Sequence, residues 1–129
     1  MTSDQINRYI GQKFTEEHNC YYWYREILKD IYGIQMPPLA GNHTVFSAAR
    51  LIRDLPELFG GRKTDKPQPG DCVFLTLGHR PHHIGIYVIV DGKPKVLHAV
   101  EGSGIVLSDM SSLRINGWRI SEYWTLRED

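Results

Sequence analysis

The chain has 129 residues, and its fifteen lysines and arginines are balanced by fifteen aspartates and glutamates. This length suits a single domain over residues 1–129 with one hydrophobic core. Because the chain has no net charge, no basic cluster and no apolar run of about 18 residues, we expect neither a nucleic-acid partner nor a membrane span. Its first residues lack the basic and apolar regions of a signal peptide, so we expect a soluble protein.

The first half of the chain carries helical patterns. Ser3 is expected to cap a short first helix that Gly11 ends. From Cys20 onward, apolar residues recur at steps of three and four, which predicts an amphipathic helix that closes near Gly33. After a break rich in proline and glycine, the stretch 44–60 repeats the helical spacing and predicts a third helix.

The second half of the chain has the composition of β-strands. Five runs are rich in β-branched and aromatic residues, namely 72–77, 83–90, 93–100, 104–108 and 117–126. The Asp91-Gly92 pair between the second and third runs is a strong signal for a tight antiparallel hairpin. Helices followed by strands predict an α+β fold, in which N-terminal helices pack on an antiparallel β-sheet of about five strands.

Cys20 stands at the expected start of the second helix, directly after Asn19, which is a favoured N-cap residue. Unpaired backbone N–H groups and the helix dipole at such a position favour the thiolate, and the same amides could cradle an oxyanion. Free cysteine is also among the most buried residue types, so a packed thiol is the competing interpretation. Cys72, the other cysteine, lies in an apolar strand, and we expect a core residue there. With only two cysteines we expect no disulfide framework.

Thiol catalysis needs a base, and two histidines lie on the strands that the Asp-Gly hairpin is expected to pair. His83 opens one strand and His98 lies within the other, so the pairing can set both on one face. One could act as the base and the other as its orienter. Gly85 removes a side chain nearby and allows a substrate or a neighbouring element to approach closely. Each histidine alone is more often structural than catalytic, but together with a helix-opening cysteine they favour a catalytic site.

The dense cluster of His79, His82 and His83 offers a metal-binding alternative. Structural zinc usually takes paired ligands from two segments, and no second pair occurs in the sequence. We therefore expect no metal and no other cofactor.

Four consecutive aromatic residues, 21–24, follow Cys20. One helix cannot bury all of them on one side, so some are expected to line a groove or to contact a partner. Core packing accounts for at least Trp23 and Tyr24.

These motifs together resemble the NlpC family of papain-like cell-wall cysteine peptidases. The strongest elements are a Pro-Gly-Asp run before the first strand, a His-Ile-Gly-Ile-Tyr strand and a following His-Ala pair. The resemblance implies a papain-like NlpC-type fold in which Cys20 is the nucleophile, His83 the general base and His98 the residue that orients the base. The stretch 19–37 is particularly similar to the branch of the family found in tail proteins of tailed phages.

Three positions near the cysteine depart from the family pattern. Family members commonly carry an aspartate before the cysteine and a serine or tryptophan after it, where this chain has Asn19 and Tyr21. Phe14 matches a tyrosine whose hydroxyl often helps to complete the oxyanion site. The resemblance therefore implies that Asn19, Tyr21 and Phe14 surround the substrate and the oxyanion, with the second oxyanion donor left unassigned.

The leading hypothesis is a cysteine endopeptidase or amidase that hydrolyses amide bonds in peptidoglycan stem peptides. By the phage resemblance, it works in cell-wall penetration or tail assembly, in the virion or in the cytoplasm of the producing cell, with other tail proteins as partners. The alternative is a catalytically weak or inactive scaffold of the same fold that binds other tail or cell-wall proteins. The aromatic run and the missing aspartate favour the scaffold, whereas the retained cysteine and histidines favour the enzyme.

Overall fold

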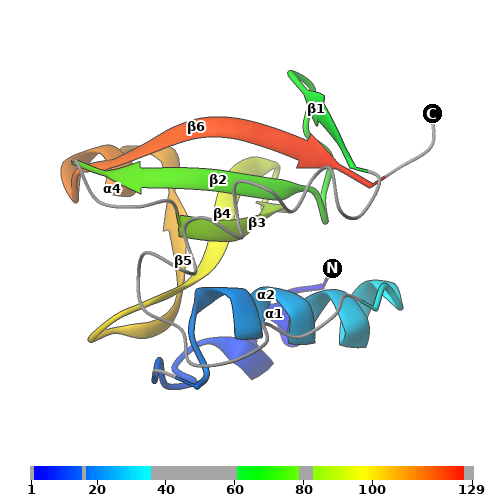
Figure 1. Cartoon of the computed structure of the whole chain (residues 1–129), viewed down its shortest axis with the longest axis vertical. Helices are drawn as coiled ribbons and strands as arrows, with labels where there is room; N and C mark the ends of the chain where they lie inside the picture. Colours follow the sequence, from blue (N-terminus) through cyan, green and yellow to red (C-terminus); the bar gives the residue numbers. More distant parts are fainter. Residues whose placement is uncertain (1, 16, 36–60, 79–82, 127–129) are drawn as a thin grey trace.

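A computed structural model of the chain describes residues 2–15, 17–35, 61–78 and 83–126 (Figure 1). The helical elements are α1 (Ser3–Tyr9), α2 (Cys20–Ile27), a π-helical turn η1 (Leu28–Tyr32) and α4 (Met110–Ile115). The strands are β1 (Arg62–Thr64), β2 (Cys72–Leu77), β3 (His83–Val90), β4 (Lys93–Val100), β5 (Gly104–Asp109) and β6 (Trp118–Thr125). The third helix predicted over 44–60 lies outside the described residues. Over the parts of the chain that the structure describes, no helix is both long and apolar enough to cross a membrane.

Side chains cap the starts of both N-terminal helices. The Thr2 hydroxyl accepts a hydrogen bond from the backbone N–H of Gln5, and the Gln5 side chain accepts one from the backbone N–H of Thr2. The N-cap of α1 is therefore Thr2, one residue before the predicted Ser3, because this capping box satisfies two backbone donors at once. At α2, the side chain of Asn19 accepts from the amide of Tyr22 at 3.0 Å, which confirms the predicted helix start.

The helix that begins at Cys20 closes at Gly33, as the sequence predicts. Gly33 adopts a left-handed conformation with φ of 69°, which glycine reaches without steric cost, and its N–H bonds back to the preceding turn. The last turn is π-helical, a detail that hydrophobic spacing does not reveal.

The six strands form one antiparallel sheet in the order β1-β6-β2-β3-β4-β5. Strands β2 to β6 confirm the five predicted runs. The sixth strand, β1, was not predicted, because its three residues are mostly exposed and show no hydrophobic pattern. The predicted hairpin between β3 and β4 is confirmed, since Asp91 (φ 54°) and Gly92 (φ 75°) form the two-residue turn between paired Val90 and Lys93. The fold is thus α+β.

The two faces of the sheet are covered by different helices. Figure 1 shows α1 and α2 together on one side of the sheet. On this side, which we call the α2 face, the core includes Ile84, Ile86, Leu97 and Ala99. On the opposite side, which we call the α4 face, a smaller cluster consists of Val73, Leu75, Val96 and Leu113, the last from α4. Because side chains alternate along a strand, neighbouring residues of β3 and β4 belong to different faces.

The segment after α1 covers the outer edge of β5. The backbone N–H of Gly11 donates to the carbonyl of Ile105 at 3.0 Å, and the N–H of Ile105 donates to the carbonyl of Gln12 at 2.8 Å. A Cβ on Gly104 would collide with the Gln12 carbonyl, so glycine is required for this approach. The pairing holds the chain that leads to Phe14 and Cys20 against the sheet.

Candidate active site

Cys20 is the first residue of α2 and is buried, with 9% of its surface exposed. Burial raises the pKa of its thiol from 9.0 to about 11, while backbone hydrogen bonds from Ile84, Tyr21 and Cys20 itself oppose this rise. The pKa therefore moves in the opposite direction from that expected of an accessible helix start. Desolvation raises the pKa of Cys20 by more than the backbone hydrogen bonds lower it, because α2 packs the thiol against the beginning of β3.

Cys72 is buried in β2, as predicted. The hydroxyl of Tyr24 donates a hydrogen bond to the sulfur of Cys72 within the core, and burial raises the pKa of this thiol as well. Cys72 is thus a packed thiol with a side-chain partner, and both cysteines are free.

His83 and His98 form a buried hydrogen-bonded pair. Nε2 of His83 lies 2.8 Å from Nδ1 of His98, and the two residues are only 7% and 3% exposed. The prediction that the hairpin sets them side by side is confirmed. They are diagonal neighbours, because the register that pairs Ile86 with Leu97 places Gly85 opposite His98.

Gly85 allows the two strands to come this close. A Cβ at this position would lie 2.6 Å from Cγ1 of Val96 and 3.1 Å from Cβ of His98. The sequence left open whether a substrate or a neighbouring element uses the space beside Gly85. The structure shows that β4 uses it.

Two side chains beside the histidine pair were not identified from the sequence. Oγ of Ser108, on β5, lies 2.9 Å from Nε2 of His98. The ring of Trp118 lies over His83 with centroids 4.7 Å apart and presents its edge to His98 at 5.9 Å. Extending the β4–β5 pairing across the short turn would have placed Ser108 near His98. No sequence signal places Trp118, because its position depends on a register shift between β2 and β6.

Burial sets the charge state of the pair. Desolvation lowers the pKa of His98 from 6.5 to about 4. The pKa of His83 is lowered well below 6.5, first by burial and then by the neighbouring His98. Both rings are therefore neutral at pH 7, and with Cys20 protonated the resting site carries no charge.

The thiol and the histidine pair approach each other from different faces of the sheet. Cys20 packs with Ile84 on the α2 face, whereas both imidazole rings lie with Trp118 on the α4 face. At the beginning of β3, the backbone of Ile84 hydrogen-bonds the thiol, and His83 is the residue next to Ile84 in the chain.

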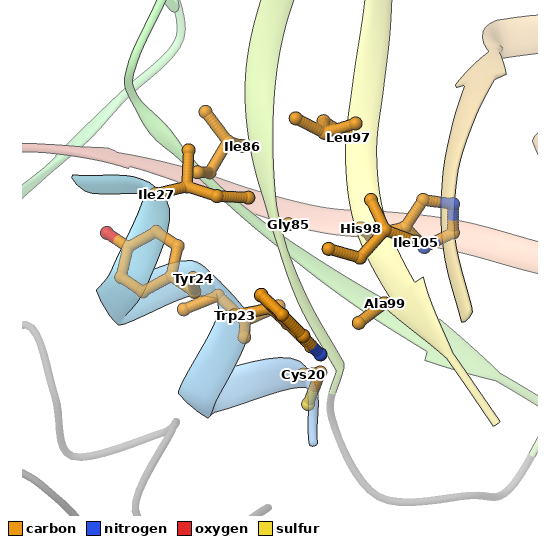
Figure 2. A pocket seen from close by; sticks show the side chains of 11 residues that line it. Cys20, Trp23, Tyr24, Ile27, Gly85, Ile86, Leu97, His98, Ala99 and Ile105 are labelled. Atoms are coloured by element: carbon orange, nitrogen blue, oxygen red, sulfur yellow. The ribbon is translucent and has the colours of Figure 1, made fainter. Parts of the chain in front are cut away.

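A cavity of about 10 Å³ lies beside the thiol, which is room for at most about one water molecule. Figure 2 shows Cys20 at the start of α2 next to this cavity, with His98 contributed by β4. Across the described ranges, no hydrogen bond joins the Cys20 thiol to the His83 ring. Because Nε2 of His83 is hydrogen-bonded to His98, Nδ1 of His83 is the ring atom left to receive a proton from the thiol.

The three residues predicted near the oxyanion have different surroundings. Asn19 uses its side-chain oxygen to cap α2. The ring of Tyr21 is buried in the core, so the group that Tyr21 presents to the Cys20 sulfur is its backbone N–H. Phe14 is half-buried against the same core and has no hydroxyl to donate.

The aromatic run divides between core and surface. Tyr24 is buried, as predicted, and Tyr21 is buried too. Trp23, predicted to be in the core, is half-buried: it packs against the core, lines the cavity and donates a hydrogen bond from Nε1 to the backbone carbonyl of Lys13 at 3.1 Å. Tyr22 stacks on His18 with centroids 4.1 Å apart, and Trp23 meets Tyr22 edge-on at 5.1 Å.

Of the three histidines of the metal-binding alternative, His79 and His82 lie outside the described residues, and His83 belongs to the buried pair with His98. Over residues 2–15, 17–35, 61–78 and 83–126, no group of three or more histidines, cysteines or carboxylates is placed to hold a metal ion.

The family model of the NlpC/P60 family matches residues 8–123, which include Cys20, both buried histidines and Ser108. No curated protein gives a significant match to the chain.

Proposed function

Because this chain belongs to the NlpC/P60 family, whose members are cell-wall cysteine peptidases and amidases, we propose that it hydrolyses amide bonds in peptidoglycan stem peptides. The observation that carries the proposal is the hydrogen-bonded pair of His83 and His98 at the strand end against which the helix-opening Cys20 packs. In this assignment Cys20 is the nucleophile, His83 is the general base and His98 orients the base.

The neutral resting state determines how the first step proceeds. Since burial keeps the Cys20 thiol protonated and the His83 ring neutral, the proton moves from Sγ to Nδ1 as the sulfur attacks the amide carbonyl. Backbone N–H groups at the start of α2 stabilise the oxyanion, including that of Tyr21. Protonated His83 then gives its proton to the leaving amine, and water hydrolyses the thioester with His83 again acting as base.

Digestion of purified peptidoglycan tests this function. The wild-type protein is incubated with peptidoglycan and with isolated stem peptides, and the released fragments are identified by mass spectrometry. New amino termini inside the stem peptide indicate an endopeptidase, and a stem peptide freed from the sugar indicates an amidase. Cys20→Ala is the matched control, and the proposal fails if folded wild-type protein releases no more than this variant.

We further propose that the domain acts in a phage tail, in cell-wall penetration or tail assembly. The support is the similarity of residues 19–37 to the tail-protein branch of the family. Mass spectrometry of purified virions tests this location. Finding the chain only in the cytoplasm of the producing cell would contradict a place in the virion.

A second candidate is an NlpC-fold scaffold that binds tail or cell-wall proteins. It is favoured by a buried Cys20 with a pKa raised to about 11 and by a cavity of only about 10 Å³. Alkylation with iodoacetamide in a Cys72→Ala background discriminates the two, because Cys20 is then the one remaining thiol. Alkylation of Cys20 in the folded protein that falls when His83 is replaced by alanine supports the enzyme, because His83 then takes the thiol proton. A rate that does not depend on His83, or a thiol that stays inert until unfolding, supports the scaffold.

A further inference from the structure

Three side chains from neighbouring strands form a continuous hydrogen-bonded chain. Nε2 of His83 lies 2.8 Å from Nδ1 of His98, and Nε2 of His98 lies 2.9 Å from Oγ of Ser108. His98 is the middle member, and both of its ring nitrogens are occupied. It is also 3% exposed, so bulk water does not replace either partner.

The direction of these hydrogen bonds is fixed once His83 takes up a proton. His83 then carries N–H groups on both ring nitrogens, so Nδ1 of His98 has to be the acceptor. The proton of neutral His98 must consequently sit on Nε2, where it is donated to the next atom in the chain. That atom is Oγ of Ser108, and a serine hydroxyl can rotate to accept.

The opposite arrangement would block the base. If the proton of His98 sat on Nδ1, it would be donated to Nε2 of His83, and the proton of neutral His83 would move to Nδ1. Nδ1 of His83 is the atom left for the thiol, so it could no longer accept. A buried Nε2–H on His98 without an acceptor is costly, so removal of the Ser108 hydroxyl favours this blocked arrangement.

We propose that Ser108 is a positioning residue whose hydroxyl accepts the Nε2–H of His98 and so keeps Nδ1 of His98 available as the acceptor for His83. The inference rests on the proposed function for the role of His83 as base, but the hydrogen-bond direction can be measured without turnover. Among the described residues, Cys20 lines the same cavity as His98, and the titratable Tyr87 and Tyr123 pack on the α4 face. Trp118 covers the histidine pair with an uncharged ring.

Three variants separate this role from a general loss of packing. Ser108→Ala removes the hydroxyl, and Ser108→Thr keeps a hydroxyl on the same strand. Ser121→Ala is the matched control, because it removes a hydroxyl from β6 of the same sheet that donates to the carbonyl of Phe74 and touches neither histidine. The full-length proteins are labelled with ¹⁵N, and the imidazole nitrogens are followed by NMR during a pH titration.

In the wild type, we expect His98 to carry its proton on Nε2. Ser108→Ala should shift this proton toward Nδ1 and lower the apparent pKa of the histidine pair, whereas Ser108→Thr and Ser121→Ala should keep the wild-type pattern. A Ser108→Ala protein with unchanged ring-nitrogen signals and unchanged pKa overturns the proposal, even if the variant is less stable.

Activity gives a separate readout. With a stem peptide as substrate, Ser108→Ala should lower kcat roughly tenfold, the factor that one hydrogen bond commonly contributes, and leave KM nearly unchanged. Ser108→Thr should recover most of this loss. Absence of hydrolysis by the wild type would contradict the proposed function and not the role of Ser108, which the NMR titration decides. Equal kcat values for wild type and Ser108→Ala would overturn the role of Ser108.

Discussion

The two faces of the sheet at β3 and β4 have opposite chemistry although they share a backbone. The α2 face carries Ile84, Ile86 and Leu97 against the helix. The α4 face carries the buried histidine pair, with Ser108 and Trp118 beside it. Alternation along the strands separates the apolar packing that positions Cys20 from the polar groups that would activate it. At one end of the sheet, the thiol contacts the backbone of Ile84, which is next in the chain to the base, His83, the first residue of β3.

Burial does not distinguish the two cysteines, since both belong to the core on the α2 face. Their neighbours differ. Cys72 accepts a hydrogen bond from the side chain of Tyr24, while Cys20 has backbone hydrogen bonds and a small cavity beside it. The cysteines should therefore respond in opposite ways to the same substitution.

The largest effect is expected for Cys20→Ala, which should lower hydrolysis by at least about a thousandfold because no nucleophile remains. The free energy of unfolding should change little, since alanine is tolerated at the start of a helix. Turnover of stem peptides and denaturant unfolding measure the two quantities.

Cys72→Ala should lower stability and leave catalysis unchanged. It leaves the buried hydroxyl of Tyr24 without its acceptor, which costs about 1–3 kcal/mol of stability, while turnover per folded molecule stays the same. Cys72→Ser should lose less stability, because serine can accept from Tyr24. Loss of activity in folded Cys72→Ser protein would mean that the nucleophile has been assigned to the wrong cysteine.

Substitutions in the histidine pair should have graded effects. His83→Ala should remove nearly all activity, by roughly a hundredfold or more, because the general base is lost. His98→Gln or His98→Asn should retain a fraction of activity, because an amide oxygen can still accept the Nε2–H of His83. His98→Ala should be worse than either amide. The four variants are compared by their single-turnover rates on one peptidoglycan fragment. A His98→Ala rate equal to that of the wild type would show that His98 has no role in catalysis.

Acid should destabilise the protein through the same pair. The unfolded chain binds a proton at His98 near pH 6.5, whereas the folded chain binds it only near pH 4. The buried neutral ring therefore contributes stability above pH 6.5, and this contribution is lost as the pH falls through 4, up to about 3 kcal/mol. The pKa of His83 is lowered too, so it acts in the same direction.

Denaturant unfolding between about pH 7.5 and pH 4 measures this loss. His98→Gln has no ring to protonate, so its stability should fall less steeply over the same range. Parallel profiles for this variant and the wild type would show that His98 does not titrate as a buried group.

The sequence predicts the parts of this molecule whose geometry is local. The cap at Asn19, the end of the helix at Gly33 and the hairpin at Asp91-Gly92 each depend on a few neighbouring residues, and all three are confirmed. The pairing of His83 with His98 follows from the hairpin, because a two-residue turn fixes the strand register.

Features that depend on tertiary packing could not be predicted in this way. The position of Trp118 depends on an irregular register between β2 and β6, and the pKa of Cys20 depends on how deeply α2 presses it against the sheet. The sequence shows that Cys20 opens a helix, which favours the thiolate, but not that burial outweighs this effect. Burial likewise depends on tertiary packing, so Trp23, which belongs to a continuous aromatic run, was expected in the core and is half-buried.

A further prediction concerns the contact between β3 and β4. Gly85→Ala adds a methyl group 2.6 Å from Cγ1 of Val96 and 3.1 Å from Cβ of His98, so β4 has to shift. The shift should cost about 1–3 kcal/mol of stability, as overpacking commonly does, and should lower turnover by moving His98 away from His83. Denaturant unfolding and single-turnover rates measure the two losses.

A second substitution separates crowding from other effects of an alanine at Gly85. Val96→Ala removes the nearest atom, so Gly85→Ala combined with Val96→Ala should lose less stability than the two single variants together. The rescue should extend to turnover, because a relaxed β4 returns His98 to within hydrogen-bonding distance of His83. Strictly additive losses would show that Val96 is not what opposes a side chain at Gly85, which would leave the contacts with His98 and the Leu97 carbonyl as the cause.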